Sequence, residues 1–266
     1  MIRDKKILIT GGSSGLGLAM AKRLAANHNQ LALVARDEKK LQQAEDTIRA
    51  EIPGAQVKGY SIDVSSPDAA GALNAAAAEM GGLDMLINSA GILREGYFQA
   101  LSDKDFRDTL EINFFGTVNT IRALLPQLKQ RQGRIINIAS IAGLTGVFGY
   151  AAYCSSKFAL IGLTESLNFE LKPQGVQVQV ACPPEFDSPM VDALDQSRTP
   201  ENRAHTLTIP KLTIEQCVDG VLKGMNSNRL IIIPGAQSKF LAFGIRHFPS
   251  ISRLIGANKI RAASNA

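Results

Sequence analysis

The sequence contains no tryptophan, and only three cysteines and three histidines occur among its 266 residues. The cysteines, Cys154, Cys182 and Cys217, are odd in number and lack CxxC spacing. This pattern argues against a disulfide framework or a zinc ribbon, and it fits a reducing compartment. Three scattered histidines cannot build a histidine-rich metal site, so we expect no bound metal.

Long apolar runs are absent as well, since none reaches the ~18–20 residues that a membrane-spanning helix needs. The first residues, MIRDKKILITGG, lead from charge into a short apolar run and a glycine turn. A secretory signal needs a longer apolar region and a cleavage site, so we expect a cytoplasmic protein. The composition, 45% hydrophobic and 20% charged, is typical of a globular chain with a sizeable core.

Acidic residues are missing from the end of the chain, where none follows Asp219. The basic residues of this stretch are Lys223, Arg229, Lys239, Arg246, Arg253, Lys259 and Arg261. The preceding part holds 22 basic against 24 acidic residues, so the net charge of +5 belongs to the last stretch. A nucleic-acid-binding protein more often carries a basic stripe across its folded face, and we expect no nucleic-acid partner.

Short apolar runs alternate with longer amphipathic segments along the chain. The predicted strands are 6–10, 30–35, 56–62, 83–88, 133–140, 176–182 and 229–234. The predicted helices are 14–27, 37–52, 66–80 (with Ser66 as N-cap), 102–130, 150–172 and 213–225. This alternation predicts parallel βαβ units. We expect an α/β fold, a single Rossmann-type doubly wound domain with a seven-stranded parallel sheet flanked by helices. It would span 1–234 with an insert at 184–212, followed by a basic, apolar extension at 235–266.

The turn TGGSSGLG (10–17) lies where the first predicted strand meets the first predicted helix. Glycines there allow tight turning, and a helix N-terminus offers free N–H groups to a phosphate. A plain strand–helix turn that merely needs glycine is the alternative, but this order of elements favours a dinucleotide-binding turn. The predicted cofactor contacts within it are Gly11, Ser13, Ser14, Gly15, Leu16 and Gly17.

Four blocks occur in the order typical of one family. The glycine turn reads TGxxxGxG, NSAG (88–91) ends the fourth predicted strand, Asn113 lies in the long middle helix, and Ser140 precedes YCSSK (153–157) by thirteen residues. With these blocks in register, the chain resembles the short-chain dehydrogenases/reductases over residues 5–234. The resemblance implies a nicotinamide-dependent oxidoreductase, whose catalytic residues would be Asn113, Ser140, Tyr153 and Lys157.

The end of the second predicted strand meets the adenosine ribose in a dinucleotide fold and selects the cofactor. This strand ends in Ala35 and Arg36 without a carboxylate, and a guanidinium matches a 2′-phosphate. Ser13 and Lys40 can add a hydroxyl and a charge, so the sequence favours NADP(H) over NAD. In the alternative, Arg36 and Lys40 form only a solvated helix start with Asp37 as N-cap.

The resemblance implies further cofactor contacts, at Asp63 for the adenine amino group, at its neighbour Val64, and along the cofactor at Asn88, Ala90 and Gly91. After the sixth predicted strand the chain reads CPPEFDSP (182–189), where most family members have PGxxxT. Pro184 replaces the glycine and stiffens this turn. The contacts expected here are Pro183, Phe186 and Ser188.

Tyr153 and Lys157 are four residues apart on a predicted helix and so share one face. A free phenol has a pKa near ~10, and an adjacent ammonium is expected to lower it toward neutrality. Tyr153 would then protonate the carbonyl oxygen as hydride arrives, while Ser140 fixes that oxygen. The resemblance implies that Asn113 holds a water that links Lys157 to solvent.

The Pro-Pro-acidic turn resembles one branch of the family, the 3-ketodihydrosphingosine reductases, which reduce a long-chain aminoketone with NADPH. TGGSSGLG, LVARDEKKL and GVFGYAAYCSSKFAL are similar to that branch as well. The alternative is a relative that acts on a steroid, acyl or small carbonyl substrate. The resemblance also implies a homodimer or homotetramer.

The extension combines apolar residues with lysine and arginine, as interfacial helices do, and Pro249 would split it into two pieces. In one interpretation its apolar side chains cover the sheet or a subunit interface. In the other, the extension and the insert form an apolar mouth that rests on an anionic membrane and admits a lipid.

Overall fold

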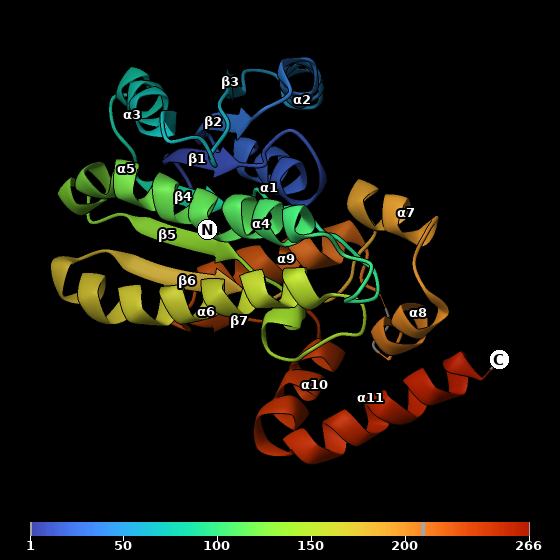
Figure 1. The fold of residues 1–266 in the computed structure, drawn as a ribbon. Coiled ribbons are helices and arrows are strands. Elements are labelled where there is room, and N and C mark those ends of the chain that lie inside the picture. Colours follow the sequence, from blue (N-terminus) through green and yellow to red (C-terminus); the bar gives the residue numbers. More distant parts are fainter. Residues whose placement is uncertain (1, 209–210, 266) are drawn as a thin grey trace.

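A computed structural model describes residues 2–208 and 211–265 (Figure 1), and in these residues the chain forms seven strands and eleven α-helices. The strands are β1 (Lys6–Thr10), β2 (Gln30–Ala35), β3 (Gln56–Ser61), β4 (Met85–Asn88), β5 (Arg134–Ile138), β6 (Gln177–Ala181) and β7 (Ile231–Ile232). The α-helices are α1 (Gly15–Ala25), α2 (Glu38–Glu51), α3 (Ala69–Glu79), α4 (Asp103–Leu110), α5 (Gly116–Gln130), α6 (Ala151–Leu171), α7 (Pro189–Asp195), α8 (Pro200–Thr206), α9 (Ile214–Met225), α10 (Ala236–His247) and α11 (Pro249–Ser264).

The strands form one parallel sheet in the order β3-β2-β1-β4-β5-β6-β7. Thr10 at the end of β1 pairs with Val34 of β2 on one side and Asn88 of β4 on the other. The strand order therefore reverses between β1 and β4, and ligands of such sheets bind outside the carboxyl ends at this point. The predicted Rossmann-type fold with a seven-stranded parallel sheet is confirmed.

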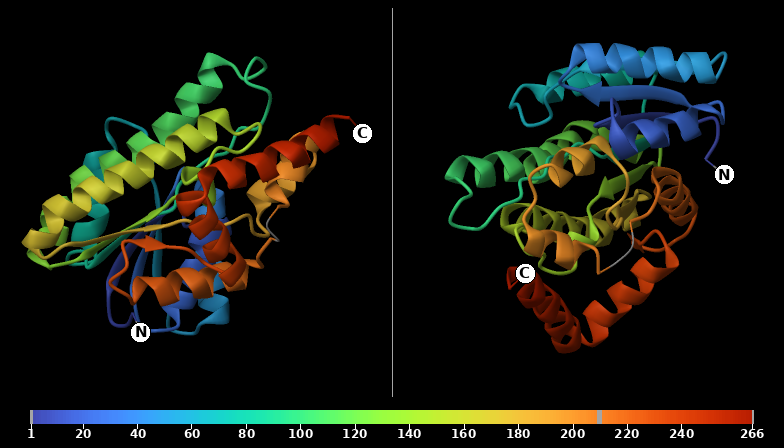
Figure 2. Two further views of the ribbon diagram at one scale, coloured as in Figure 1. Left: turned by 90° about the horizontal axis from the view of Figure 1, so that it is seen from below. Right: turned by 90° about the vertical axis from the view of Figure 1, so that its right-hand side faces the viewer.

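Helices cover both faces of the sheet (Figure 2). Apolar residues of α1, α2 and α9 pack on one face, where Met20, Ile48 and Val221 are fully buried. On the other face α3, α5 and α6 bury residues such as Leu73 and Leu124. The strands between them are almost wholly apolar, as strands covered on both faces must be.

Three predicted elements differ from the structure. The third helix begins at Ala69 with Asp68 as N-cap, not at Ser66, because the Ser66 hydroxyl accepts the Asp68 N–H in a separate turn before the helix. The region 102–130 is interrupted by a π-helical segment, Glu111–Phe115. The last strand is reduced to Ile231–Ile232, an edge strand that pairs only with β6.

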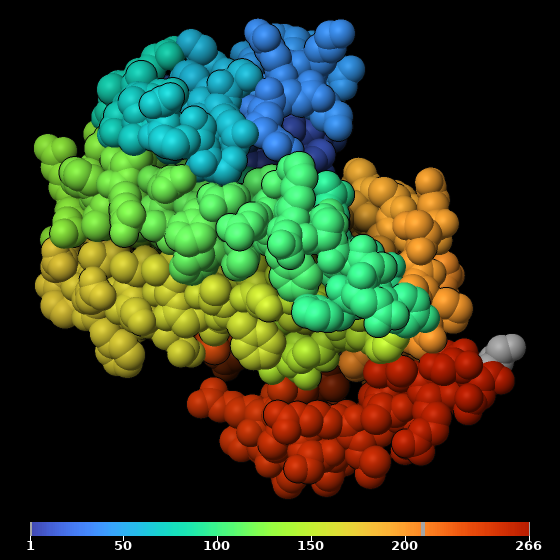
Figure 3. Space-filling model, in the orientation of Figure 1, coloured from blue at the N-terminus to red at the C-terminus, as the bar shows by residue number. Residues whose placement is uncertain are grey.

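The insert and the extension lie together at one end of the molecule, where α11 packs beside α8 (Figure 1). Pro249 occupies the first turn of α11 and separates it from α10, as the sequence predicted. Gly256 permits the close approach of α11, since a Cβ there would lie 2.8 Å from Nε2 of His205 on α8. Figure 3 shows the extension standing off from the body, with a hollow between them. In the described part of the chain no helix is long and apolar enough to span a bilayer.

Candidate active site

One pocket of about 350 Å³ opens at the carboxyl end of the sheet. The pocket is lined by the glycine turn, the loop after β4, the end of β5 with the turn that follows it, and the start of α6. The end of β6, the insert, and the inner sides of α10 and α11 complete the lining. Most of its lining is apolar, with Ile141, Val147, Phe186, Leu241 and Ile255 among the contributors. The site thus lies where the strand order reverses, and the insert and the extension, which follow β6, form its other side.

The glycine turn forms the end of the pocket nearest β1. A Cβ at Gly17 would overlap the Gly11 carbonyl oxygen, and a Cβ at Gly11 would lie 2.8 Å from the Ala90 nitrogen, so the backbones can touch only because side chains are absent. Gly15 has a φ of +51°, and nothing lies within 4 Å of where its Cβ would point.

The N-terminus of α1 begins in this turn. Its N-cap Ser14 makes no side-chain capping bond, and no acidic residue occurs in the first turn. Backbone N–H groups at such a terminus attract anions. Open space beside Gly15 and an uncapped helix start therefore fit the phosphates of a dinucleotide, as predicted for Gly11, Ser14, Gly15, Leu16 and Gly17, all of which line the pocket.

Arg36 and Lys40 lie outside the pocket lining, exposed on the surface at the end of β2. The Asp37 carboxylate accepts the Lys40 N–H at 3.0 Å and caps α2. No carboxylate in the described part of the chain pairs with the Arg36 guanidinium or the Lys40 ammonium. The cap of the alternative interpretation is therefore present, and both cations also remain available to an anion. Ser13, half-buried, is likewise outside the lining.

Four further residues predicted from the resemblance lie outside the lining. Asp63 accepts bonds from the Ser65 nitrogen and hydroxyl at 3.0 and 2.6 Å, and the buried side chain of its neighbour Val64 would meet a Cβ at Gly116. Asn88 donates to Asn137 Oδ1 at 2.9 Å and accepts from Thr120 Oγ1 at 2.6 Å, so its side chain joins β4 to β5 and α5. The Ala90 nitrogen donates to Thr10 Oγ1 at 3.2 Å. Only Gly91 of this predicted group reaches the pocket, together with Ser89, for which the sequence had given no such role.

Ser140, Tyr153 and Lys157 converge on the pocket floor. Ser140 follows β5 and caps a short helical turn by accepting the Ala142 N–H at 3.1 Å. Tyr153 and Lys157 come from the first turns of α6, with the Lys157 ammonium 5.5 Å from the centre of the tyrosine ring. Lys157 donates to the Ile138 carbonyl at 2.9 Å, which fixes its position.

The titration of this group differs from the prediction. Burial raises the pKa of Tyr153 to about 12, partly offset by a hydrogen bond from the Ser140 hydroxyl. Burial also lowers the pKa of Lys157 to about 8, because the interior disfavours its ammonium. The expectation that Lys157 brings the phenol toward neutrality is wrong for this structure, because burial of the phenol dominates its pKa. The phenol is held protonated at neutral pH.

Asn113 is fully buried behind the floor and does not line the pocket. Its amide bonds both backbone groups of Ile92, at 2.8 and 2.9 Å, and donates to Ser156 Oγ at 3.0 Å. A Cβ at Gly91 would lie 3.2 Å from Asn113 Oδ1 and 3.6 Å from Lys157 Nζ, so both side chains approach this glycine. Asn113 stands in the π-helical segment, where the extra residue per turn redirects the side chain.

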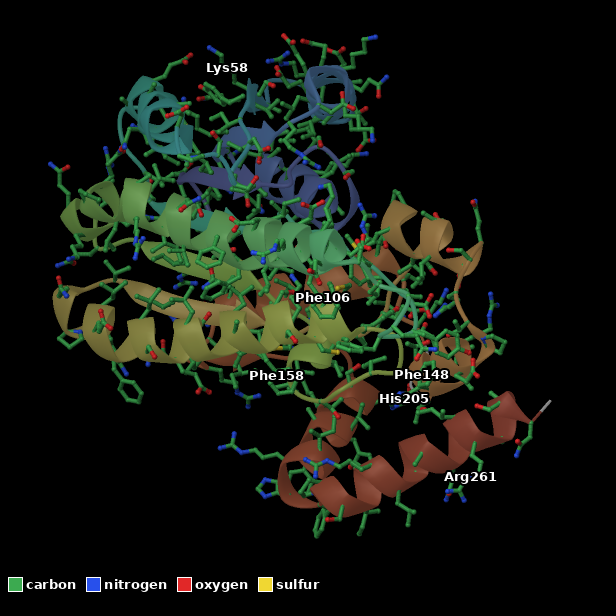
Figure 4. All side chains as sticks on the ribbon, in the orientation of Figure 1. Lys58, Phe106, Phe148, Phe158, His205 and Arg261 are labelled. Atoms are coloured by element: carbon green, nitrogen blue, oxygen red, sulfur yellow. The ribbon has the colours of Figure 1, made fainter. Side chains whose placement is uncertain are left out.

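The turn after β6 supplies the wall opposite the glycines. Pro183, Phe186 and Ser188, which the sequence gave as expected cofactor contacts, line the pocket, and Ser188 Oγ accepts the Val191 N–H at 3.3 Å as N-cap of α7. Glu185 and His205 also line it, although the sequence had suggested no role for either. His205 accepts the Phe148 N–H on Nδ1 at 3.1 Å, and the two residues lie side by side between α8 and α11 (Figure 4).

Comparison with known proteins gives consistent results. The family model described as short chain dehydrogenase matches residues 5–199. The chain is 37% identical over 254 residues to the 3-ketodihydrosphingosine reductase of Bos taurus, covering 92% of this chain and 76% of the bovine protein. It is 34% identical over 201 residues to a 3-oxoacyl-acyl-carrier-protein reductase of Vibrio cholerae, covering 74% and 80%.

Solved structures share the fold. A short-chain dehydrogenase from Sphingobium yanoikuyae, solved in complex with NADPH, superposes with a TM-score of 0.77 at 27% identity. The match covers 93% of this chain and 95% of that one.

Proposed function

The chain belongs to the short-chain dehydrogenase family, and on that premise we propose that it reduces the ketone of a long-chain lipid with NADPH. The observation that carries the proposal is the pocket itself. Ser140, Tyr153 and Lys157 stand between a glycine turn suited to phosphates and an apolar compartment lined by the insert and the extension.

The proposed cofactor is NADP(H), which supplies the hydride when bound. The uncapped start of α1 and the open space beside Gly15 support a pyrophosphate at the glycine turn. Arg36, Lys40 and Ser13 are the proposed partners of a 2′-phosphate, and the NADPH complex of the Sphingobium relative agrees with this choice. The proposed contacts of the rest of the cofactor are Asp63, Val64, Asn88, Ala90, Gly91, Pro183, Phe186 and Ser188.

In the proposed mechanism, Tyr153 holds the proton that the carbonyl oxygen receives. Its raised pKa keeps the phenol protonated at neutral pH, which is the state that reduction requires. Ser140 donates a hydrogen bond to the same oxygen and positions it. Lys157 places a cation beside the phenol and stabilises the phenolate left after transfer, and Asn113 orders the backbone at Ile92 and Gly91 behind it.

The proposed substrate is a long-chain aminoketone such as 3-ketodihydrosphingosine. The bovine relative carries that name at 37% identity, and the apolar lining of the pocket suits a hydrocarbon chain. The alternative is a steroid, acyl or small carbonyl substrate. The similarity to the acyl-carrier-protein reductase of Vibrio cholerae supports the acyl substrate.

A kinetic comparison decides between these substrates. Purified protein is assayed with 3-ketodihydrosphingosine, a 3-oxoacyl thioester, a steroid ketone and short ketones, first with NADPH and then with NADH. The proposal requires the highest kcat/KM for the long-chain aminoketone with NADPH. A higher value for the thioester or the steroid would replace the substrate, and a preference for NADH would overturn the cofactor.

We also propose peripheral contact with an anionic membrane through the extension. Five exposed apolar side chains of the extension lie outside the pocket lining, with exposed fractions of 54–79%: Phe240, Phe243, Phe248, Ile251 and Leu254. Basic residues flank them, and Arg261 points away from the body on the outer side of α11 (Figure 4). Apolar insertion with basic flanks is how interfacial helices bind anionic lipid.

The test of membrane contact leaves the pocket intact. Phe240→Ser combined with Leu254→Ser changes only exposed side chains of the extension, and Phe98→Ser, which alters a 74% exposed phenylalanine before α4, is the matched control. Co-sedimentation with phosphatidylglycerol vesicles should fall for the double variant and stay unchanged for the control. Equal binding by all three proteins would refute the contact, as would equal binding to neutral vesicles.

A homodimer or homotetramer remains a proposal too. Phe158 and Phe169 are exposed by 47% and 78% and lie eleven residues apart on one side of α6, which suits a helical subunit interface. Light scattering coupled to gel filtration measures the mass directly, and a monomer at micromolar concentration would refute the proposal.

A further inference from the structure

The insert that follows β6 is closed at its base by backbone hydrogen bonds. Phe186 and Leu212 form a parallel bridge, in which the Asp187 N–H donates to the Leu212 carbonyl at 3.2 Å. The Leu212 N–H donates in turn to the Glu185 carbonyl at 3.0 Å. Both ends of the insert therefore meet beside the pocket, and Glu185 stands at their junction.

The Glu185 carboxylate is held by Arg198 in a two-pronged contact. Arg198 Nη2 lies 2.9 Å from Glu185 Oε1, and Nη1 lies 3.1 Å from Oε2. The Arg198 side chain is 1% exposed and that of Glu185 is 12% exposed, so the pair is shielded from water and from salt. A planar guanidinium that bonds both carboxylate oxygens fixes direction as well as distance.

The Arg198 guanidinium also contacts both helices of the insert, α7 and α8. Arg198 Nη2 pairs with the Asp195 carboxylate at the end of α7, and Nη1 donates to Thr206 Oγ1 on α8 at 2.9 Å. One side chain therefore ties the turn after β6 to both helices that follow it.

Lys211 completes the group from the returning end of the insert. Its ammonium lies 2.9 Å from Asp195 Oδ2 and 3.3 Å from Glu185 Oε1. Two cations thus face two anions, and the cluster is neutral as a whole. Removal of Glu185 or Arg198 leaves an unbalanced charge at the part of the cluster that is shielded from water.

Within the cluster Glu185 lines the pocket, and Asp195, Arg198 and Lys211 stand behind the same wall. Phe186 and Ser188 next to Glu185, Met190 and Val191 of α7, and Thr206 of α8 all line the pocket. Among the described residues, no hydrogen bond of Glu185 or Arg198 reaches Ser140, Tyr153 or Lys157. The pair therefore acts on the wall that a substrate touches, and the proton donor is held by other elements.

We propose that Glu185 and Arg198 are positioning residues, a clamp that holds the insert against the pocket and so sets the affinity for substrate. This gives the acidic residue of the Pro-Pro-acidic turn a role that the reductase mechanism leaves unassigned. The clamp rests on the proposed function in one respect, that the pocket binds the carbonyl substrate. The identity of that substrate does not enter.

The test uses the full chain and three variants. Glu185→Gln keeps the shape and removes the charge, Arg198→Lys keeps the charge and loses the fork, and Arg203→Gln is the control. Arg203 is also in the insert and touches Asp195 but makes no contact with Glu185. Steady-state kinetics use whichever ketone the parent reduces best, so failure of the sphingoid substrate leaves this test intact.

The clamp requires KM for that ketone to rise by about tenfold in Glu185→Gln with kcat within a few-fold of the parent, as loss of a charge-assisted bond implies. Arg198→Lys should fall between the parent and Glu185→Gln, and the control should match the parent. KM unchanged in both clamp variants, or kcat lowered with KM constant, would overturn the proposal.

Hydrogen exchange of the substrate-free protein gives a readout independent of activity. Amides of residues 187–208 should exchange faster in Glu185→Gln, while those of α1 and α6 keep the parental rates. Combining Glu185→Gln with Arg198→Lys should add little to the larger single effect, because both act on one contact. Uniformly faster exchange over the whole chain, or strictly additive effects on KM, would show that the pair does not hold the insert.

Discussion

Replacement of Lys157 by methionine should separate the stability of the fold from its activity. Lys157 is 5% exposed, and burial lowers its pKa from 10.5 to about 8. A lysine with a lowered folded pKa binds fewer protons in the folded than in the unfolded state between the two pKa values. The stability of the parent protein therefore rises with pH through this window, and the group destabilises it below pH 8.

The size of the effect follows from the two pKa values. The interval from 10.5 to about 8 corresponds to about 3 kcal/mol, most of which is recovered between pH 7 and pH 10. Lys157→Met also loses the bond to the Ile138 carbonyl, which costs ~1–3 kcal/mol at every pH. The pH-dependent part of the difference between the two proteins thus reports the buried charge alone.

Urea unfolding at pH 7, 8, 9 and 10 measures this difference without cofactor. The stability of the variant relative to the parent should decline by about 2–3 kcal/mol across the series, while reductase activity is lost at every pH. Lys172→Met, at an exposed lysine just past the end of α6, should run parallel to the parent. Parallel curves for Lys157→Met as well would show that the ammonium is not desolvated and would refute the reasoning.

The remaining predictions concern single contacts. Tyr153→Phe keeps the ring but loses the proton, so turnover should fall by ~10²–10⁴, while NADPH, followed by its own fluorescence, binds with the parental affinity; activity within a few-fold of the parent would remove Tyr153 from its role. Arg36→Asp replaces attraction for the 2′-phosphate by repulsion, and NADPH affinity measured by fluorescence should drop roughly tenfold or more without loss of NADH binding. Gly17→Ala forces a Cβ into the Gly11 carbonyl, and it should lower stability by ~1–3 kcal/mol in urea and weaken both dinucleotides; parental stability would show that the turn can yield.

Local pattern sufficed to predict much of the fold and part of the site. The glycine turn could be placed because strand, turn and helix are adjacent in the sequence, and Pro249 separates α10 from α11 as predicted. Ser140, Tyr153 and Lys157 meet in one pocket because parallel strands end at one edge of the sheet. Such features depend on neighbours in the chain or on a rule common to the fold.

What the sequence could not predict depends on tertiary surroundings. Nothing local indicates that burial raises the pKa of Tyr153, although Lys157 lies one helical turn away. No local pattern indicates that the Asn88 side chain bonds to Asn137 and Thr120, partners 49 and 32 residues away. Pairing of Glu185 with Arg198 joins two residues thirteen apart across a loop whose path no periodicity describes.

Because the strand order reverses between β1 and β4, two separate stretches of the chain meet at one pocket. The proposed determinants of nucleotide choice, Ser13, Arg36 and Lys40, are all encoded before β3, whereas the segments that shape the far side of the pocket follow β6. Tyr153, the proposed proton donor, lies on α6 between these two stretches of the chain. Recombination within the stretch from β4 to α6 would therefore pass on the nucleotide preference of one parent with the substrate range of the other. Enzymes with this sheet can therefore change their substrate without changing their nucleotide cofactor.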